Sequence, residues 1–208
     1  MKYELYSTRN GSKIEIPIPT SYKDCLELLQ SDYYRIFGRV DSLPKIWMKS
    51  FRDRALKHLF WLRFASYHGW LYPLCKLLHE HYKFKYDCRV HAGAKIGYGL
   101  YLGHAMSMCV NIRCIIGNNV NLSQMSNIGT NAGNQAIIAN NVYIGPMTSL
   151  FEGVHIGENS LVGAGSIVTK DVSPNSTAVG NPCRVIGENK HPEYVQNRWT
   201  VKQRNHVI

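Results

Sequence analysis

The sequence lacks the cysteine spacings that mark zinc sites and disulfide frameworks. Its six cysteines are scattered along the chain, with no CxxC pair and no arrangement of Cys and His into two ligand pairs. The first residues also contain no apolar leader segment. We therefore expect reduced thiols, no bound metal and a cytoplasmic location.

Long apolar runs and acidic residues are also scarce. The most apolar stretch, residues 56–78, is interrupted by Lys57, His58, Arg63 and Lys76, so it cannot cross a bilayer without burying charge. Lys and Arg number 24 against 14 acidic residues, a net charge of +10. Because the cations are spread out, nucleic acid is the least favoured partner, and anionic lipid or a phosphorylated small molecule fits better. Simple solubility is the alternative explanation.

The sequence does contain a six-residue repeat. A helix would repeat at three and four residues and an ordinary strand at two, whereas a period of six fits a coil with three flat sides. Aliphatic residues would then fill the core, with glycine often relieving the crowded corner that follows. The prediction is a mainly β fold, a hexapeptide β-helix. The aliphatic positions are Val90, Ile96, Leu102, Val110, Ile116, Leu122, Ile128, Ile138, Ile144, Leu150, Ile156, Val162 and Val168.

Two interruptions break the register of this repeat. The step from Leu102 to Val110 is two residues too long, and the step from Ile128 to Ile138 is four too long. Extra residues in a solenoid must leave one corner as a loop. These two loops are the first places to expect a functional site.

The chain divides into three predicted regions. Residues 1–85 form a mainly helical cap or oligomerisation region, residues 86–187 form the β-helix, and residues 188–208 form a basic tail. The tail has no periodicity, which predicts a short helix or a loosely packed segment.

Local signals predict the elements of the first region. An Asn10-Gly11 turn and the alternating strand 13–18 indicate a hairpin, and a helix should begin near Thr20 or Ser21. Helical patterns follow over residues 43–67 and 72–82. We expect these helices to pack together and cap the open end of the β-helix. The alternative is a basic, aromatic face that rests on an anionic membrane surface.

Two parts of the repeat resemble known enzymes. Residues 94–104 (AKIGYGLYLGH), 116–124 (IGNNVNLSQ) and 127–129 (NIG) resemble the serine acetyltransferase branch of the hexapeptide acyltransferases. Residues 163–171 (GAGSIVTKD) and 178–186 (AVGNPCRVI) are similar to the last coil of the galactoside and maltose acetyltransferases. The resemblance implies a left-handed parallel β-helix with an N-terminal mostly α-helical domain. It also implies a homotrimer with active sites between neighbouring prisms, and acetyl-CoA bound along the groove.

His104 is the candidate catalytic residue. It lies two places after Leu102 and opens the first irregular coil, so it should point away from the core. An outward histidine is usually only surface, but the match of residues 99–105 to the family's catalytic histidine region implies a catalytic role. A hydroxyl needs a base to attack a thioester, and imidazole is suited to that near neutral pH. Backbone N–H groups at glycine corners could stabilise the oxyanion, with Gly129 as the candidate.

The resemblance also implies which residues contact acetyl-CoA. Lys170 and Arg184 match positions near the anionic nucleotide end, although both could be ordinary solvated cations. Pro146, Ala164 and Thr169 fall where the family's wall touches the pantetheine arm.

Several positions depart from the serine acetyltransferase pattern. Arg89 and Ile112 stand where that branch has an aspartate and a glutamate, which leaves the orientation of His104 to Asp87 or a carbonyl. The loop 130–135 carries no charge and so offers no partner for a serine carboxylate. These departures favour acetyl transfer to a sugar hydroxyl of a polysaccharide or its precursor.

Other functions remain open on the sequence alone. Serine O-acetylation is the main alternative, and an amino sugar could be N-acetylated by the same base. A γ-type carbonic anhydrase would need His91, His104 and His155 to converge on one metal, which their different repeat phases do not favour. A non-catalytic β-helix scaffold is the binding-protein alternative.

Overall fold

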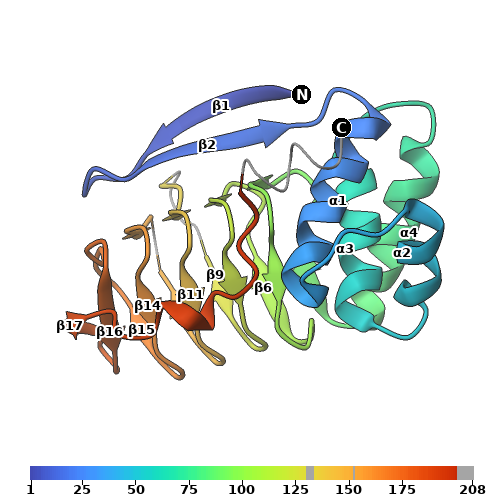
Figure 1. The fold of residues 1–208 in the computed structure, drawn as a ribbon. Coiled ribbons are helices and arrows are strands. Elements are labelled where there is room, and N and C mark those ends of the chain that lie inside the picture. Colours follow the sequence, from blue (N-terminus) through green and yellow to red (C-terminus); the bar gives the residue numbers. More distant parts are fainter. Residues whose placement is uncertain (130–133, 152, 201–208) are drawn as a thin grey trace.

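A computed structural model describes residues 1–129, 134–151 and 153–200. The second half of the chain winds into a stack of triangular coils, and four helices close one end of that stack (Figure 1). A two-stranded hairpin lies along one side of the coils. The predicted mainly β architecture with an N-terminal helical region is therefore confirmed.

Parallel strands form the three walls of the solenoid, and each strand pairs with the strand of the next coil. We call them the first, second and third walls. The first wall contains β4 (Lys95–Ile96), β7 (Ile115–Ile116), β10 (Ile137–Ile138) and β13 (His155–Ile156). The second wall contains β5 (Tyr101–Leu102), β8 (Asn121–Leu122), β11 (Tyr143–Ile144), β14 (Leu161–Val162), β16 (Ser176–Val179) and the antiparallel β17 (Arg184–Glu188). The third wall contains β3 (Cys88–Val90), β6 (Met108–Val110), β9 (Asn127–Ile128), β12 (Ser149–Leu150) and β15 (Ile167–Val168).

The predicted aliphatic positions form the core of the solenoid. All thirteen are at most 6% exposed, and they stack in register from coil to coil, as Ile116 does on Ile138. Glycine follows many of them because the next coil passes very close. A Cβ on Gly117 would lie 2.7 Å from the carbonyl carbon of Ala139. The six-residue pattern thus specifies both the stacked aliphatic core and the close approach of neighbouring coils.

Asparagines stabilise the corner between the first and second walls. Asn119, Asn141, Asn159 and Asn175 all have a positive φ of 55–58°, a conformation that asparagine tolerates better than most residues. Each of the first three side chains donates to the next one along the stack, over 3.0–3.3 Å. This ladder satisfies the amide groups at a corner where the backbone turns sharply.

The helical region caps the first coil. Helix α1 (Tyr22–Phe37) begins at Ser21, whose hydroxyl accepts the N–H of Asp24, and ends at Gly38 with φ 67°. Helices α2 (Leu43–Ser50) and α3 (Arg54–Phe64) replace the single helical stretch predicted for residues 43–67, because Asp53 starts a new helix. Helix α4 (Tyr72–Lys85) follows. No helix in the described part of the chain is long and apolar enough to cross a membrane.

The N-terminal hairpin covers the outside of the first wall. Strands β1 (Lys2–Ser7) and β2 (Lys13–Ile18) pair as predicted, and Gly11 takes a φ of 88° in the turn. Ile14 and Ile16 are completely buried against this wall. At the tip, the backbone N–H of Arg9 donates to Nδ1 of His155.

The C-terminal segment returns along the second wall. After the 3₁₀ turn η1 (Pro192–Tyr194) it runs back towards the helices, as the red trace in Figure 1 shows. Trp199 is only 5% exposed, and its backbone N–H and carbonyl both bond to the side chain of Asn119. Of the predicted short helix or loosely packed segment, the described residues 189–200 contain one 3₁₀ turn and two buried anchors, Val195 and Trp199.

Candidate active site

His104 lies in the extra turn that follows β5. Its side chain is exposed, and its backbone has a φ of 58°. The neighbouring Ala105 and Ser107 have φ values of 40° and 50°. Three non-glycine residues with positive φ within four positions are unusual, and such backbone strain concentrates at functional sites. The first register slip of the sequence therefore coincides with the most strained turn beside the solenoid.

Two grooves meet at His104. The groove expected to hold acetyl-CoA, called the donor groove, has a volume of about 520 Å³ and runs along the second wall beneath the C-terminal segment. The groove expected to hold the acceptor, called the acceptor groove, has a volume of about 470 Å³ and lies on the side of the helices. The donor groove is lined by Arg35, Ile36, Tyr101, Gly103, His104, Asn121, Ser123, Gln124, Tyr143, Pro146, Tyr194, Gln196 and Asn197. The acceptor groove is lined by Ile36, Arg52, Asp53, Arg54, Ala55, Tyr101, Leu102, His104 and Met106.

The predicted residues Pro146 and Ala164 share one edge of the prism with His104. Each lies two residues after a strand of the second wall (β5, β11 and β14), so they mark the same corner in the first, third and fourth coils, and Gln124 occupies that corner in the second. Pro146 lines the donor groove together with His104, and Ala164 is exposed one coil further on. The structure therefore aligns these three predicted site residues along one edge.

The other predicted residues lie away from His104 within one chain. Thr169 and Lys170 follow β15 of the third wall and are exposed. Arg184 begins β17, and the neighbouring Cys183 N–H donates to the carbonyl of Ile167 at the base of the same coil. Lys170 and Arg184 thus share the end of the solenoid opposite the helices.

Gly129 follows β9 on the third wall and not on the edge of His104. Its backbone N–H donates to the carbonyl of Leu150 at 3.0 Å. Since that hydrogen bond belongs to the coil stacking, the N–H is already engaged within the chain. The oxyanion role remains a prediction, which this hydrogen bond disfavours.

The acceptor groove brings charged groups to His104 that the sequence analysis missed. Asp53 is the N-cap of α3, where one carboxylate oxygen accepts the N–H of Leu56 at 2.9 Å. Arg52 and Arg54 flank it, and the guanidinium of Arg54 lies 5.2 Å from the ring centre of Tyr86. The N-cap pattern was visible in the sequence, but 51 positions separate Asp53 from His104. Only the packing of the helices on the first coil brings them together.

Arg35 holds the wall of the donor groove. This α1 residue donates to the carbonyls of Gly99 and Gln196, each at 2.7 Å, and to the side chain of Asn121. Burial lowers its pKa to about 10, so the guanidinium remains charged at neutral pH. It therefore joins a helix, the second wall and the C-terminal segment beside the candidate site.

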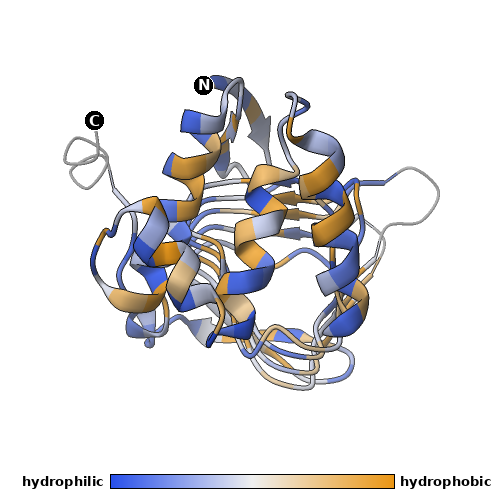
Figure 2. Cartoon of the chain, turned by 90° about the vertical axis from the view of Figure 1, so that its right-hand side faces the viewer, coloured by the Kyte–Doolittle hydropathy of each residue, from blue (hydrophilic) through white to orange (hydrophobic). Residues whose placement is uncertain are grey.

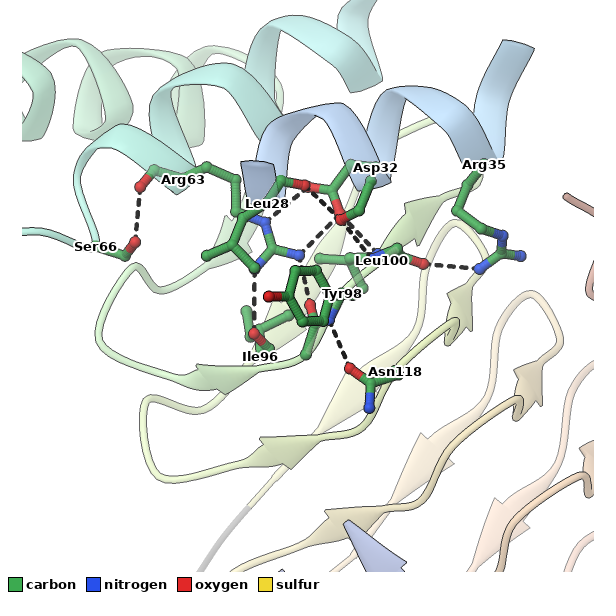
Figure 3. A network of polar contacts seen from close by, with 12 residues as sticks. Leu28, Asp32, Arg35, Arg63, Ser66, Ile96, Tyr98, Leu100 and Asn118 are labelled. Atoms are coloured by element: carbon green, nitrogen blue, oxygen red, sulfur yellow. Dashed lines mark hydrogen bonds and ion pairs between the residues drawn. The ribbon is translucent and has the colours of Figure 1, made fainter. Parts of the chain in front are cut away.

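Asp32 and Arg63 fix the helices to the first coil behind this groove (Figure 3). Arg63 binds the Asp32 carboxylate with two nitrogens and also donates to the carbonyls of Ile96 and Gly97. Asp32 accepts the N–H of Leu100 at 2.7 Å. This network fixes the start of β5, the strand that carries His104.

The groups considered for other roles are engaged elsewhere. Asp87, considered as a support for His104, forms an ion pair of 3.0 Å with Arg89. His155 contacts the hairpin through Arg9. His91 follows β3 on the third wall, His104 follows β5 on the second, and His155 lies in β13 on the first. They therefore lie on three different faces of one chain.

Comparison with known proteins agrees with this fold. A family profile described as the hexapeptide repeat of succinyl-transferase matches residues 113–146 and 148–170. The serine acetyltransferase of Bacillus subtilis is 31% identical over 169 residues, which cover 78% of this chain and 77% of that protein. The chain belongs to the hexapeptide-repeat acyltransferase family. Its solenoid is the left-handed parallel β-helix of that family.

Other members of the hexapeptide-repeat acyltransferase family match more partially. The galactoside O-acetyltransferase of Escherichia coli is 36% identical over 115 residues, covering 50% of this chain and 57% of that protein. The crystal structure of serine acetyltransferase from Vibrio cholerae has a TM-score of 0.68 at 22% identity, covers 82% of this chain and 69% of that one, and shares the fold. The chain spans 27% of the mitochondrial serine acetyltransferase 3 of Arabidopsis thaliana. It thus represents between about a quarter and just over half of several curated relatives.

Proposed function

We propose that this protein is an acetyl-CoA-dependent O-acetyltransferase in which His104 is the general base. The observation that carries the proposal is the position of His104 at the meeting point of two grooves. A base between a donor and an acceptor can act on both. The imidazole takes the proton of the acceptor hydroxyl as its oxygen attacks the thioester carbon. The tetrahedral intermediate then expels the CoA thiolate, which receives that proton from the imidazolium.

Acetyl-CoA extends along the prism edge from His104 in this proposal. Pro146 and Ala164 would contact the pantetheine arm, and Thr169 would lie near its end. Lys170 and Arg184 would bind the phosphates, because both are exposed cations at the far end of the solenoid. The homotrimer expected of the family would bring grooves of neighbouring prisms together. The grooves of one chain are open, which supports a site completed by a second subunit.

L-serine is the acceptor that we favour. A relative whose match covers 78% of this chain is named a serine acetyltransferase, and a solved structure of that name shares the fold. The acceptor groove adds a physical argument, because it carries a carboxylate and two guanidinium groups beside His104. Asp53 would pair with the ammonium group of the amino acid, and Arg52 or Arg54 with its carboxylate. These residues supply the charged partners that loop 130–135 lacks; its residues 130–133 lie outside the described part of the chain.

A sugar hydroxyl is the second candidate. The galactoside O-acetyltransferase of E. coli supports it, as do the departures at Arg89 and Ile112 from the serine acetyltransferase pattern. We place either reaction in the cytoplasm, which is consistent with six unpaired cysteines in the structure.

The release of free thiol from acetyl-CoA tests the proposal. The panel comprises L-serine, simple sugars, amino sugars, nucleotide sugars and purified polysaccharide. His104→Ala should lower turnover roughly 100-fold or more while acetyl-CoA binding, measured by calorimetry, persists. Wild-type turnover in that variant would overturn the catalytic assignment. Turnover with a sugar but not with L-serine would overturn the favoured acceptor, and absence of CoA binding would favour a scaffold.

A further inference from the structure

Several large apolar side chains are exposed at the helical end of the molecule. In Figure 2, which views the molecule from that end, hydrophobic segments alternate with hydrophilic ones along the helices. Four of the exposed apolar side chains recur at helical spacing on α4 and the turn before it. Lys57 lies between α4 and the residue that follows α2, because its Nζ is 5.4 Å from the ring centre of Phe51 and 5.6 Å from that of Tyr82. The exposed apolar residues are Trp47, Met48, Phe51, Trp70, Leu74, Leu77 and Phe84, with exposures from 45% to 81%.

The same region has an excess of positive charge. Residues 42–86 contain nine Lys and Arg but only two acidic residues, Asp53 and Glu80. Asp53 caps α3, and Glu80 pairs with Lys83 at 2.5 Å. Lys45, Arg52, Lys76 and Lys85 are exposed among the apolar side chains. We call these four cations and the seven apolar residues the end surface.

We propose that the end surface binds the headgroup region of an anionic lipid membrane. Exposed Trp, Phe and Leu insert at the boundary between headgroups and acyl chains, and neighbouring Lys and Arg pair with anionic lipids. A second copy of this chain fits less well, because a two-fold contact brings the same patch onto itself. Cations would then face cations without acidic partners. The surface therefore fits a negatively charged, partly apolar partner.

Binding in this orientation would bring the acceptor groove next to the membrane. Arg52 belongs to the end surface and also lines the groove that contains His104. An acceptor held at the lipid surface would then approach His104 from the helical side. This consequence rests on the proposed function, whereas the membrane contact itself does not.

Vesicle flotation of the full chain tests the proposal without any activity measurement. We expect the protein to float with phosphatidylcholine vesicles that contain phosphatidylglycerol, and not with pure phosphatidylcholine. Salt at about 1 M, which shortens the Debye length to about 3 Å, should release most of it. The double variant Trp70→Ser/Leu77→Ser should bind roughly tenfold more weakly or worse. Lys76→Glu/Lys85→Glu should show a similar loss.

Matched controls separate the end surface from general charge and hydrophobicity. Leu5→Ser removes an apolar side chain that is 78% exposed on the hairpin, and Lys13→Glu/Lys190→Glu reverses two exposed charges elsewhere. Both controls should float like the parent protein, and circular dichroism should show all variants folded. Equal loss in the controls, or no flotation of the parent with anionic vesicles, overturns the proposal. If the parent does not float and the double variant Trp70→Ser/Leu77→Ser abolishes its self-association, measured by light scattering, the end surface binds a second copy of the chain and not a membrane.

Discussion

The carboxylate of Asp32 and the guanidinium of Arg63 form a 2.7 Å ion pair in which both side chains are almost completely buried. Because a lone buried charge is costly, Asp32→Ala should lower the free energy of unfolding by about 3–5 kcal/mol. Urea denaturation followed by circular dichroism measures the change. Arg89→Ala is the control, since it breaks the ion pair with Asp87, in which both side chains are 56% exposed, and should cost no more than about 1 kcal/mol. Equal effects of the two variants would contradict the role of the buried pair.

Asp53→Asn distinguishes the two acceptors. Asparagine caps a helix as well as aspartate does, so the variant should unfold at the same denaturant concentration as the parent. If L-serine is the acceptor, loss of the carboxylate should raise its KM about tenfold or more while the KM for acetyl-CoA stays unchanged. An unchanged KM for L-serine would remove Asp53 from the acceptor site.

Gln196→Ala tests whether the C-terminal segment forms part of the donor groove. Gln196 lines that groove, and its carbonyl, which accepts from Arg35, is retained in the variant, so only the side chain is removed. We expect the KM for acetyl-CoA to rise about threefold to tenfold, equivalent to one hydrogen bond, with little change in stability. Glu193→Ala lies on the same segment outside the groove and should have no effect. Equal changes in the KM for acetyl-CoA in the two variants, measured by steady-state kinetics, would contradict the assignment.

The protein should lose stability in mild acid because of His58 and His79. Their rings are buried with centres 5.2 Å apart, and burial lowers the pKa of His58 to about 3 and that of His79 to about 4. Both remain neutral when folded but take up protons when unfolded, so their contribution is complete above pH 6.5 and declines as the pH falls towards 4. Each can add a slope of up to about 1.4 kcal/mol per pH unit.

Urea denaturation at a series of pH values measures that slope. His58→Leu should make it shallower, whereas replacement of the exposed His68 by Leu should not. Lys83 lies near both histidines and Glu80 lies near His79. The parent and the His58→Leu variant should therefore be compared with these two residues unchanged. A parent protein equally stable at pH 7 and pH 5 would be inconsistent with neutral buried imidazoles.

Asn141 tests the ladder at the corner of the solenoid. Asn141→Ala loses two side-chain hydrogen bonds and forces alanine into a φ of 58°, which should cost about 2 kcal/mol or more. Asn141→Gly loses the same bonds but accommodates the backbone, so it should cost less. Thermal denaturation of the two variants separates the conformational effect from the hydrogen bonds. Equal melting temperatures would show that the backbone conformation contributes little.

The periodic part of the fold could be predicted from sequence because each coil repeats the same local rule. The thirteen aliphatic positions between Val90 and Val168 are all in the core, as the six-residue spacing predicts. The hairpin and the start of α1 follow from Gly11 and Ser21. The break between α2 and α3 was missed because apolar residues continue across it. Asp53 was its only strong signal.

The site was harder to predict because it depends on contacts between distant segments. The register slip and the family resemblance together indicate His104, whereas the resemblance alone indicates Pro146 and Ala164. Asp53 and Gln196 reach the same place only because α1 and α3 pack on the first coil and the last residues return along the second wall. No periodicity in the sequence encodes that return, which rests on individual pairs such as Asn119 with Trp199.

Along the edge shared by His104, Pro146 and Ala164, the distance between two sites is a whole number of coil steps. Neighbouring strands of a sheet are about 4.8 Å apart, so the three coil steps from His104 to Ala164 span about 14 Å. The number of coils along this edge therefore sets the length of ligand that can reach from one end of the site to the other. Inserting or deleting one coil between β8 and β14 would keep the pairing of each strand with the next coil and change the reach of the site by a fixed increment, while the hairpin and the C-terminal segment would have to adjust. In such a protein, the number of coils itself would be a determinant of which donor fits.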